Sequence, residues 1–163
     1  MFGKSIHHVF MIYINKPFII ITSSTLIISS LIALSRTNWI LLWIAMEINI
    51  LSFIPIITIS KKNQETEATI KYFIAQALGS SLILITSISQ WTTSSLPYTD
   101  IILRGAILLK LGIAPIHFWF PSVITSLSWI SCIILATWQK LAPLIILSFI
   151  LIQDMYWLYL LLH

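Results

Sequence analysis

Three ionisable side chains lie deep inside apolar stretches of this sequence. They are Glu47, Lys110 and Lys140, and each has mostly Leu, Ile, Ala or Trp residues on both sides. Placing one charged residue at the centre of a bilayer costs roughly 2.5–3.5 kcal/mol on insertion scales. Residues kept at that cost usually mark a proton or ion path, where they face one another or water inside a helix bundle. The three residues therefore predict proton or ion transfer within a membrane.

Each of the three also has a structural interpretation. Lys110 could extend its ammonium group to a membrane interface, but it directly precedes a helix break at Gly112, which favours a transfer role. Lys140 lies near Pro143, where freed helix carbonyls could stabilise a cation. Glu47 could be a neutral buried acid that hydrogen-bonds a neighbour. With two buried lysines in the same chain, we favour an ion pair for Glu47.

His117 begins an aromatic run that ends at Phe120, next to the expected break. It could be a core histidine with satisfied hydrogen bonds or a further proton relay, and the residues leave both interpretations open. No metal-ligand spacing, phosphate-binding glycine loop or nucleophile motif occurs in the sequence. The single cysteine, Cys132, allows neither an internal disulfide nor a cysteine cluster, and we expect it to be a packing residue. We therefore expect no metal site and no cofactor on this chain.

The composition indicates a membrane protein. Of 163 residues, 58% are hydrophobic and 9% are charged, whereas soluble domains are about 45–50% apolar and about 25% charged. We expect an all-α integral membrane fold with one transmembrane domain over residues 1–163. The net charge of +4 comes from basic residues scattered at segment ends. This pattern relates to membrane topology and argues against nucleic acid as a partner.

A membrane-spanning helix needs about 20 mainly apolar residues, and on this criterion the sequence predicts about five spans. Thr66 is the expected N-cap of the third of them. A further apolar segment follows Met155 and is too short to cross. The expected helices cover residues 17–35, 39–59, 68–90, 100–120 (broken), 122–152 (bent near 143) and the start of a sixth at 155–163.

Proline and glycine positions predict where the helices are interrupted. Gly112, Pro115 and Pro121 fall within ten residues of one another. A proline removes one backbone hydrogen bond and frees the carbonyl four residues earlier, so the fourth helix should be broken between Gly112 and Pro121. Pro143 should bend the fifth helix for the same reason. Discontinuous helices recur at the ion sites of transporters, because their free backbone groups line a cavity.

Lysine and arginine counts predict the orientation. Five lysines flank one set of expected helix ends and two arginines the other, and short loops with more basic residues stay on the electrically negative side of a membrane. The N-terminus should therefore face the cytoplasm, or the matrix in a mitochondrion. The two sets are Lys4, Lys16, Lys61, Lys62 and Lys71 against Arg36 and Arg104.

Four sequence segments, taken in order, resemble one family. They are NWILLWIAMEINILSFIP (38–55), TEATIKYFIAQ (66–76), KLGIAPIHFWFP (110–121) and TWQKLAP (137–143). Together they closely resemble the chain 2 family of mitochondrial NADH–ubiquinone oxidoreductase, the antiporter-like subunits in the membrane arm of respiratory complex I. The similarity extends from about Thr22 to Leu147.

The resemblance implies a fold and a role for each buried charge. Family members contain two inverted five-helix repeats, each with a discontinuous helix, and the segments here correspond to the first repeat, the N-terminal half. By resemblance, Glu47 pairs with a lysine, Lys110 is that lysine on the broken helix, and Lys140 is the next relay lysine. The resemblance also implies a multi-pass protein of the mitochondrial inner membrane with its N-terminus toward the matrix.

The function implied is a share in proton translocation coupled to electron transfer from NADH to ubiquinone. Glu47, Lys110 and Lys140 would move the protons, with His117 as a weaker candidate. Redox chemistry would take place on other subunits of the enzyme. The expected partners are the other membrane-arm subunits and lipids, without which the chain would not function. Two alternatives are a cation/proton antiporter that works alone and a purely structural membrane subunit whose buried charges fix the helix register.

Overall fold

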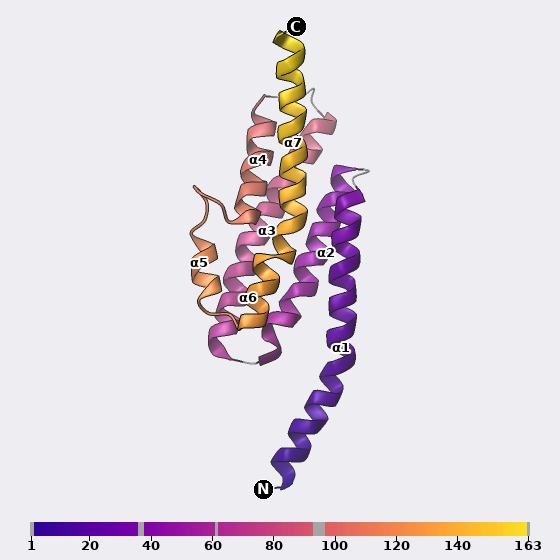
Figure 1. The fold of residues 1–163 in the computed structure, drawn as a ribbon, viewed down its shortest axis with the longest axis vertical. Helices are drawn as coiled ribbons and strands as arrows, with labels where there is room; N and C mark the ends of the chain where they lie inside the picture. Colours follow the sequence, from indigo (N-terminus) through magenta and orange to yellow (C-terminus); the bar gives the residue numbers. More distant parts are fainter. Residues whose placement is uncertain (1, 36–37, 61, 93–96, 163) are drawn as a thin grey trace.

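The computed structural model describes all residues except 1, 36–37, 61, 93–96 and 163, and it leaves the side chains of 2–15, 60, 97 and 157 undescribed. The described residues form helices and no strands, which confirms the expected all-α class. The first three helices run alternately up and down, and the later helices, including the long one that ends at the C-terminus, complete the bundle (Figure 1). The elements are α1 (Phe2–Ser35), α2 (Trp39–Ile57), the 3-10 helix η1 (Thr58–Ser60), α3 (Asn63–Thr92), α4 (Pro97–Leu111), α5 (Trp119–Ile124), α6 (Trp129–Ala136) and α7 (Trp138–Leu162).

Helices α1 and α3 begin earlier than expected, and α2 ends two residues earlier, at Ile57. We expected α1 to begin at Pro17, but the helix continues back to Phe2 and contains the proline, because losing one backbone bond does not end a helix that otherwise continues. Likewise α3 begins at Asn63 rather than residue 68. The N-cap expected at Thr66 is wrong, since its hydroxyl donates to the carbonyl of Asn63 at 2.7 Å inside the helix.

Four helical segments of the described chain are long and apolar enough to cross a membrane. The expected span over residues 100–120 is not among them, because α4 ends at Leu111 and only the six-residue α5 follows. The four are Lys16–Ser35, Trp39–Ile57, Asn63–Thr92 and Trp129–Leu162.

The region expected as one bent helix over 122–152 consists of three helices. After α5 ends at Ile124 the chain turns, and α6 starts after Ser128. The next interruption comes at Thr137 instead of Pro143. The hydroxyl of Thr137 donates to the carbonyl of Ile133 at 2.6 Å, and such bonds compete with the helix ladder and bend it. Helix α7 continues through Pro143, although proline has no N–H group and one backbone hydrogen bond is therefore missing at this position.

The sixth helix expected from residue 155 is also wrong. Helix α7 continues without interruption through Met155 to Leu162. No Gly or Pro lies between Leu144 and Leu162 to end it. The apolar residues at the end of the chain therefore extend α7.

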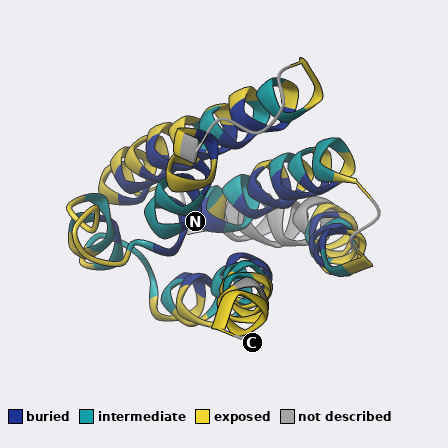
Figure 2. Cartoon of the chain, turned by 90° about the horizontal axis from the view of Figure 1, so that it is seen from above, coloured by how far each residue is buried: buried dark blue, intermediate teal, exposed yellow. Residues whose placement is uncertain are grey.

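Helix α3 holds the bundle together, since it packs against α2, α4 and α5. Seen along the bundle, buried residues face the interior, whereas the helix that ends at the C-terminus is mostly exposed (Figure 2). Two large apolar clusters and a small one of Ala33, Ala45 and Ala142 lie in the interior of the described bundle. One of the large clusters joins α2, α3, α5 and α6 around Phe53 and Tyr72, and the other joins α2, α3, α4 and α7 around Ile83 and Ile107.

Candidate functional site

Lys110 lies in the last turn of α4 and points into the bundle. Its side chain is 4% exposed and crosses α3 at Gly79. A Cβ atom at Gly79 would lie 2.8 Å from Cγ of Lys110 and 3.3 Å from the carbonyl oxygen of Ala106. The missing side chain of glycine therefore makes the room that Lys110 occupies between α3 and α4.

Helix α4 ends by a glycine cap. Gly112 has φ of +64°, a left-handed conformation that glycine adopts without a steric penalty. The N–H groups of Gly112 and Ile113 donate to the carbonyls of Leu109 and Leu108 at 3.1 and 3.2 Å. This is the Schellman arrangement of a helix C-terminus. The break at Gly112 thus lies where the sequence predicted it, and its cause is the glycine.

The proline explanation of the break needs correction in part. Pro121 is the third residue of α5, within the first turn, where a helix has no internal partner for an N–H group. Pro121 therefore suits the start of α5 and does not break a helix. The segment between α4 and α5 connects them as an exposed loop through Pro115.

Two side chains bind the carbonyl groups at the end of α4. Gln76 Nε2 of α3 donates to the carbonyl of Lys110 at 3.1 Å, and Trp119 Nε1 of α5 donates to the carbonyl of Leu109 at 3.0 Å. The last four carbonyls of a helix lack partners within it. The carbonyl of Lys110 gains a partner in this way, and the carbonyl of Leu109 gains a second one besides the N–H of Gly112. Both bonds connect the backbone that carries Lys110 to the neighbouring helices α3 and α5.

The ammonium nitrogen of Lys110 is buried and has no hydrogen-bond partner among the described residues. The charge that acts on it electrostatically is that of Glu47 on α2. Both side chains are described, and no ion pair within 4 Å joins them. The direct pair expected for Glu47 is absent because Lys110 lies against α3. Glu47, which is itself only partly buried, thus acts on Lys110 through space and not through an ion pair.

Lys140, in the first turn of α7, packs against the broken segment. Its Nζ lies 3.7 Å from the centroid of the Phe120 ring on α5, a distance typical of a cation–π interaction. The side chain is partly buried, and no described carboxylate forms an ion pair with it. The structure therefore links Lys140 to Lys110 indirectly, through the neighbouring residues Trp119 and Phe120.

His117 lies apart from the other candidates. Its side chain is exposed on the loop between α4 and α5 and stacks on Phe118, with ring centroids 5.4 Å apart at 14°. The interpretation as a core histidine is therefore wrong, because Gly112 turns the chain outward before residue 117. The structure gives His117 no contact with Glu47, Lys110 or Lys140.

Three polar residues close in sequence or in space to the candidate charges were not identified as candidates from the sequence. Tyr72 of α3, 1% exposed, donates to Oε1 of Gln139 at 3.3 Å, and Gln139 Nε2 donates to Oδ1 of Asn49 at 3.5 Å. Asn49 follows Glu47 by two residues and Gln139 precedes Lys140. The signal in the sequence was polarity within an apolar run, which these residues share with the lysines. The network joins α2, α3 and α7 beside the site.

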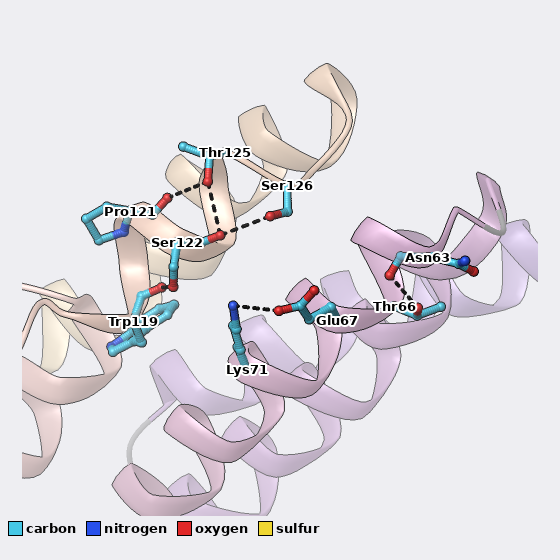
Figure 3. A network of polar contacts seen from close by, with 9 residues as sticks. All are labelled: Asn63, Thr66, Glu67, Lys71, Trp119, Pro121, Ser122, Thr125 and Ser126. Atoms are coloured by element: carbon cyan, nitrogen blue, oxygen red, sulfur yellow. Dashed lines mark hydrogen bonds and ion pairs between the residues drawn. The ribbon is translucent and has the colours of Figure 1, made fainter.

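An exposed lysine on α3 provides a contrast with Lys110. Lys71 Nζ and Glu67 Oε1 are 2.9 Å apart, on the outer face beside Trp119 and Ser122 of α5 (Figure 3). The two side chains are 46% and 68% exposed. Exposed pairs of this kind contribute about 0.3–0.5 kcal/mol to stability. Lys71 is thus a charged neighbour with an ordinary surface role.

Comparisons with known proteins agree with the sequence segments discussed above. Residues 36–162 match the family described as "NADH:quinone oxidoreductase/Mrp antiporter, TM". The chain is 56% identical over 143 residues to NADH-ubiquinone oxidoreductase chain 2 of Lumbricus terrestris, an alignment that covers 86% of this chain and 43% of the relative. It is 41% identical over 138 residues to the Anopheles gambiae protein of the same name, covering 80% and 40%.

A third relative, chain 2 of Locusta migratoria, is 35% identical over 142 residues, covering 83% of this chain and 41% of the relative. The chain thus spans about two fifths of the length of the curated relatives that it matches. The family match covers most of the chain, including Glu47, Lys110 and Lys140. The buried lysine on an interrupted helix and the family match together show that this chain belongs to the NADH:quinone oxidoreductase/Mrp antiporter family of membrane proteins.

Proposed function

We propose that this chain is part of a membrane-arm subunit of respiratory complex I and takes part in proton translocation coupled to electron transfer from NADH to ubiquinone. The observation that carries the proposal is Lys110, whose ammonium nitrogen is buried without a hydrogen-bond partner among the described residues. A buried, unpaired ammonium group favours losing its proton, because the charged form is poorly solvated. The relatives matched above are named as chain 2 of NADH-ubiquinone oxidoreductase.

In the proposed mechanism, Glu47 controls the proton on Lys110. The carboxylate of Glu47 stabilises the protonated lysine through space, and the carbonyl end of α4 adds the negative end of a helix dipole. A movement of α2, or protonation of Glu47, weakens this stabilisation, and Lys110 then releases its proton. Ordered water carries the proton onward, and Lys140 is the next acceptor. Gln76 and Trp119 keep Lys110 in place, because they hold the backbone that carries it.

The chain would exert this role within a complex. Its single cysteine cannot hold an iron–sulfur cluster, which takes four protein ligands, so we propose that electron transfer occurs on other subunits and that this chain binds no cofactor. Its proposed partners are other membrane-arm subunits and lipids, which would cover apolar residues exposed on α7 such as Leu158 and Leu161. We propose no nucleic acid partner.

We propose that the protein lies in the mitochondrial inner membrane with its N-terminus toward the matrix. Helix α1 begins at the same end of the molecule as the connection between α2 and α3 (Figure 1). Lys16 and Lys62 belong to that end, while Arg104 lies in the middle of α4, which begins at the other end. Lysine-rich short connections stay on the negative side of a membrane. The side chains of Lys4, Lys61 and Arg36 lie outside the described residues.

The test is Lys110→Met in the full-length chain within the assembled complex. We expect the number of protons translocated per NADH oxidised to fall, because methionine keeps the length of the side chain and removes its proton. Lys71→Met is the matched control, since Lys71 is exposed and paired on the neighbouring helix. An unchanged proton ratio in Lys110→Met, with the complex assembled in normal amount, would reject the role of Lys110.

A second candidate is a cation/proton antiporter that works alone, since the matching family description includes the Mrp antiporter. Reconstitution of the full-length protein without partners separates the two. Cation-driven proton exchange by the protein alone favours the antiporter. Exchange that requires the other subunits favours the role in complex I. If neutral substitutions of Glu47, Lys110 and Lys140 leave coupled turnover intact, the charges have a structural role only.

A further inference from the structure

Gln139 lies at the centre of a hydrogen-bonded network that has no part in the mechanism above. Both ends of its amide group form bonds. Oε1 of Gln139 accepts from the hydroxyl of Tyr72 at 3.3 Å, and its Nε2 donates to Oδ1 of Asn49 at 3.5 Å. We call these three residues the Gln139 network. It holds the first turn of α7 to α3 on one side and to α2 on the other.

Tyr72 is the rigid end of this network. The side chain is 1% exposed, and its ring packs edge-on against Phe53, with centroids 5.5 Å apart, and at a tilt against Trp119, with centroids 6.0 Å apart. Trp119 in turn donates to the carbonyl of Leu109 at the end of α4. Aromatic rings packed on several sides in a dense core have little freedom to move. The hydroxyl of Tyr72 is therefore a fixed anchor for Gln139.

The bond between Gln139 and Asn49 is the weaker end of the network. Its length of 3.5 Å exceeds the usual N–H···O distance of about 2.9–3.0 Å. Asn49 is buried and follows Glu47 by two residues on α2. Side chains with this spacing point to different faces of a helix, but the helix moves them together. A movement of α2 that displaces Glu47 therefore also displaces Asn49 and breaks its long bond to Gln139.

The first turn of α7 depends on side-chain contacts for its position. The chain is interrupted at Thr137, directly before this turn, so α6 and α7 are separate helices there. Further along α7, Oδ2 of Asp154 lies 2.6 Å from Nη2 of Arg104, an ion pair that holds the helix to α4. Between these two points, Gln139 and the cation–π contact of Lys140 hold the start of α7. Because Lys140 directly follows Gln139, the position of one depends on the bonds of the other.

We propose that Gln139 is a positioning residue that makes the place of Lys140 depend on the position of α2. This inference rests on the function proposed above for the three candidate charges. In the structure, Asn49 holds Gln139 and Lys140 lies against an aromatic ring. When α2 moves and Glu47 withdraws from Lys110, the same movement releases Gln139. The first turn of α7 is then free to carry Lys140 from the ring toward the proton donor, so that donor and acceptor respond to one helix.

Asn49→Leu, Gln139→Leu and the double variant test the coupling in the full-length chain within its assembled complex. Each removes the bond between α2 and α7, and the double variant leaves neither amide unpaired. We expect backbone amides in the first turns of α7 to exchange hydrogen for deuterium about two- to tenfold faster, the factor that one lost hydrogen bond produces. The number of protons translocated per NADH oxidised should fall at an unchanged rate of NADH oxidation. The double variant should lose no more than Gln139→Leu alone, because both substitutions break the same connection.

Ser52→Ala is the matched control and should change neither readout, because Ser52 is buried on α2 and its hydroxyl donates to the carbonyl of Asn49 within the same helix. Unchanged exchange in Asn49→Leu would overturn the coupling. So would additive losses in the double variant, or a normal proton ratio in complexes that only assemble in smaller amount. Lys110→Met is measured beside these variants. If it lowers the proton ratio and Asn49→Leu does not, the coupling fails and the proposed function stands, whereas a normal ratio in Lys110→Met rejects both.

Discussion

At the scale of single residues, the position of Lys110 depends on Gly79 of the facing helix α3, which has no side chain to fill the space that Lys110 occupies. Gly79 is buried among small and polar residues of α3, and the stem of Lys110 fills the space above it. Protein cores are packed so densely that one added methyl group destabilises them. Lys110 is therefore held as much by the shape of α3 as by electrostatics.

Replacement of Gly79 by alanine tests this packing. The new Cβ atom would lie 2.8 Å from Lys110 Cγ and 3.3 Å from the backbone oxygen of Ala106. We expect Gly79→Ala to destabilise the protein by about 1–3 kcal/mol, as overpacked cores do, and to lower proton translocation by displacing Lys110. The midpoint of thermal inactivation of the assembled complex measures the first effect.

Gly105→Ala on α4 is the matched control, because no atom lies within 4 Å of a Cβ placed there. It should leave stability unchanged or raise it by about 0.5–1 kcal/mol, since alanine favours helices over glycine. Equal effects of the two substitutions would show that Gly79 does not position Lys110.

At the scale of elements, the proposed site depends on the end of α4. Backbone bonds at Gly112 close the helix, and side chains from α3 and α5 bind its last carbonyls. The short helix α5 then places the Phe120 ring under Lys140 of α7. The interrupted helix thus brings three elements to one point, which a continuous helix through residue 120 could not do.

Gly112→Ala tests the helix end. A left-handed conformation costs a residue with a Cβ atom roughly 1–2 kcal/mol, and the new atom would lie 3.0 Å from Cβ of Phe120. We expect a loss of stability of at least that size and a weaker contact between Phe120 and Lys140. Thermal inactivation of the assembled complex, measured beside the Gly105→Ala control, provides the check. An unaltered midpoint would mean that the chain closes α4 in another way.

At the scale of the whole molecule, the bundle has two distinct ends. One end contains the beginning of α1 and the connection between α2 and α3, and the other contains the start of α2 and the end of α7 (Figure 1). Apolar residues remain exposed along α7 and on the outer faces of α1 and α3. Such surfaces suit lipid or further protein, in agreement with relatives that extend well beyond the matched region.

The two-ended arrangement predicts opposite labelling of its ends. Asn63, exposed at the start of α3, should be accessible as Asn63→Cys only from the N-terminal side, which we propose faces the matrix, because charged reagents do not cross the bilayer. Asn63→Cys is introduced into the Cys132→Ser variant, which removes the one cysteine of residues 1–163. The rate of labelling in sealed mitochondria and in inverted inner-membrane vesicles measures the side from which Asn63→Cys is accessible. Modification of Asn63→Cys from the outer face of sealed inner membranes would reverse the proposed orientation.

The sequence by itself determined the fold class, the family and the burial of Lys110, whereas Glu47 and Lys140 are only partly buried. Long apolar runs leave helices as the only stable choice in a membrane, and charged residues inside them are conspicuous because they are costly. Gly112 also predicted the break in the fourth helix. These features depend on local composition, which is visible in the chain without neighbours.

Only the tertiary structure decided which side chains meet. The space for Lys110 over Gly79, the contact of Lys140 with Phe120 and the outward position of His117 depend on how helices far apart in sequence pack together. The same holds for the division at Thr137 and for the Arg104–Asp154 pair across α4 and α7. Packing and interhelical hydrogen bonds set these relations, and no periodicity within one segment encodes them.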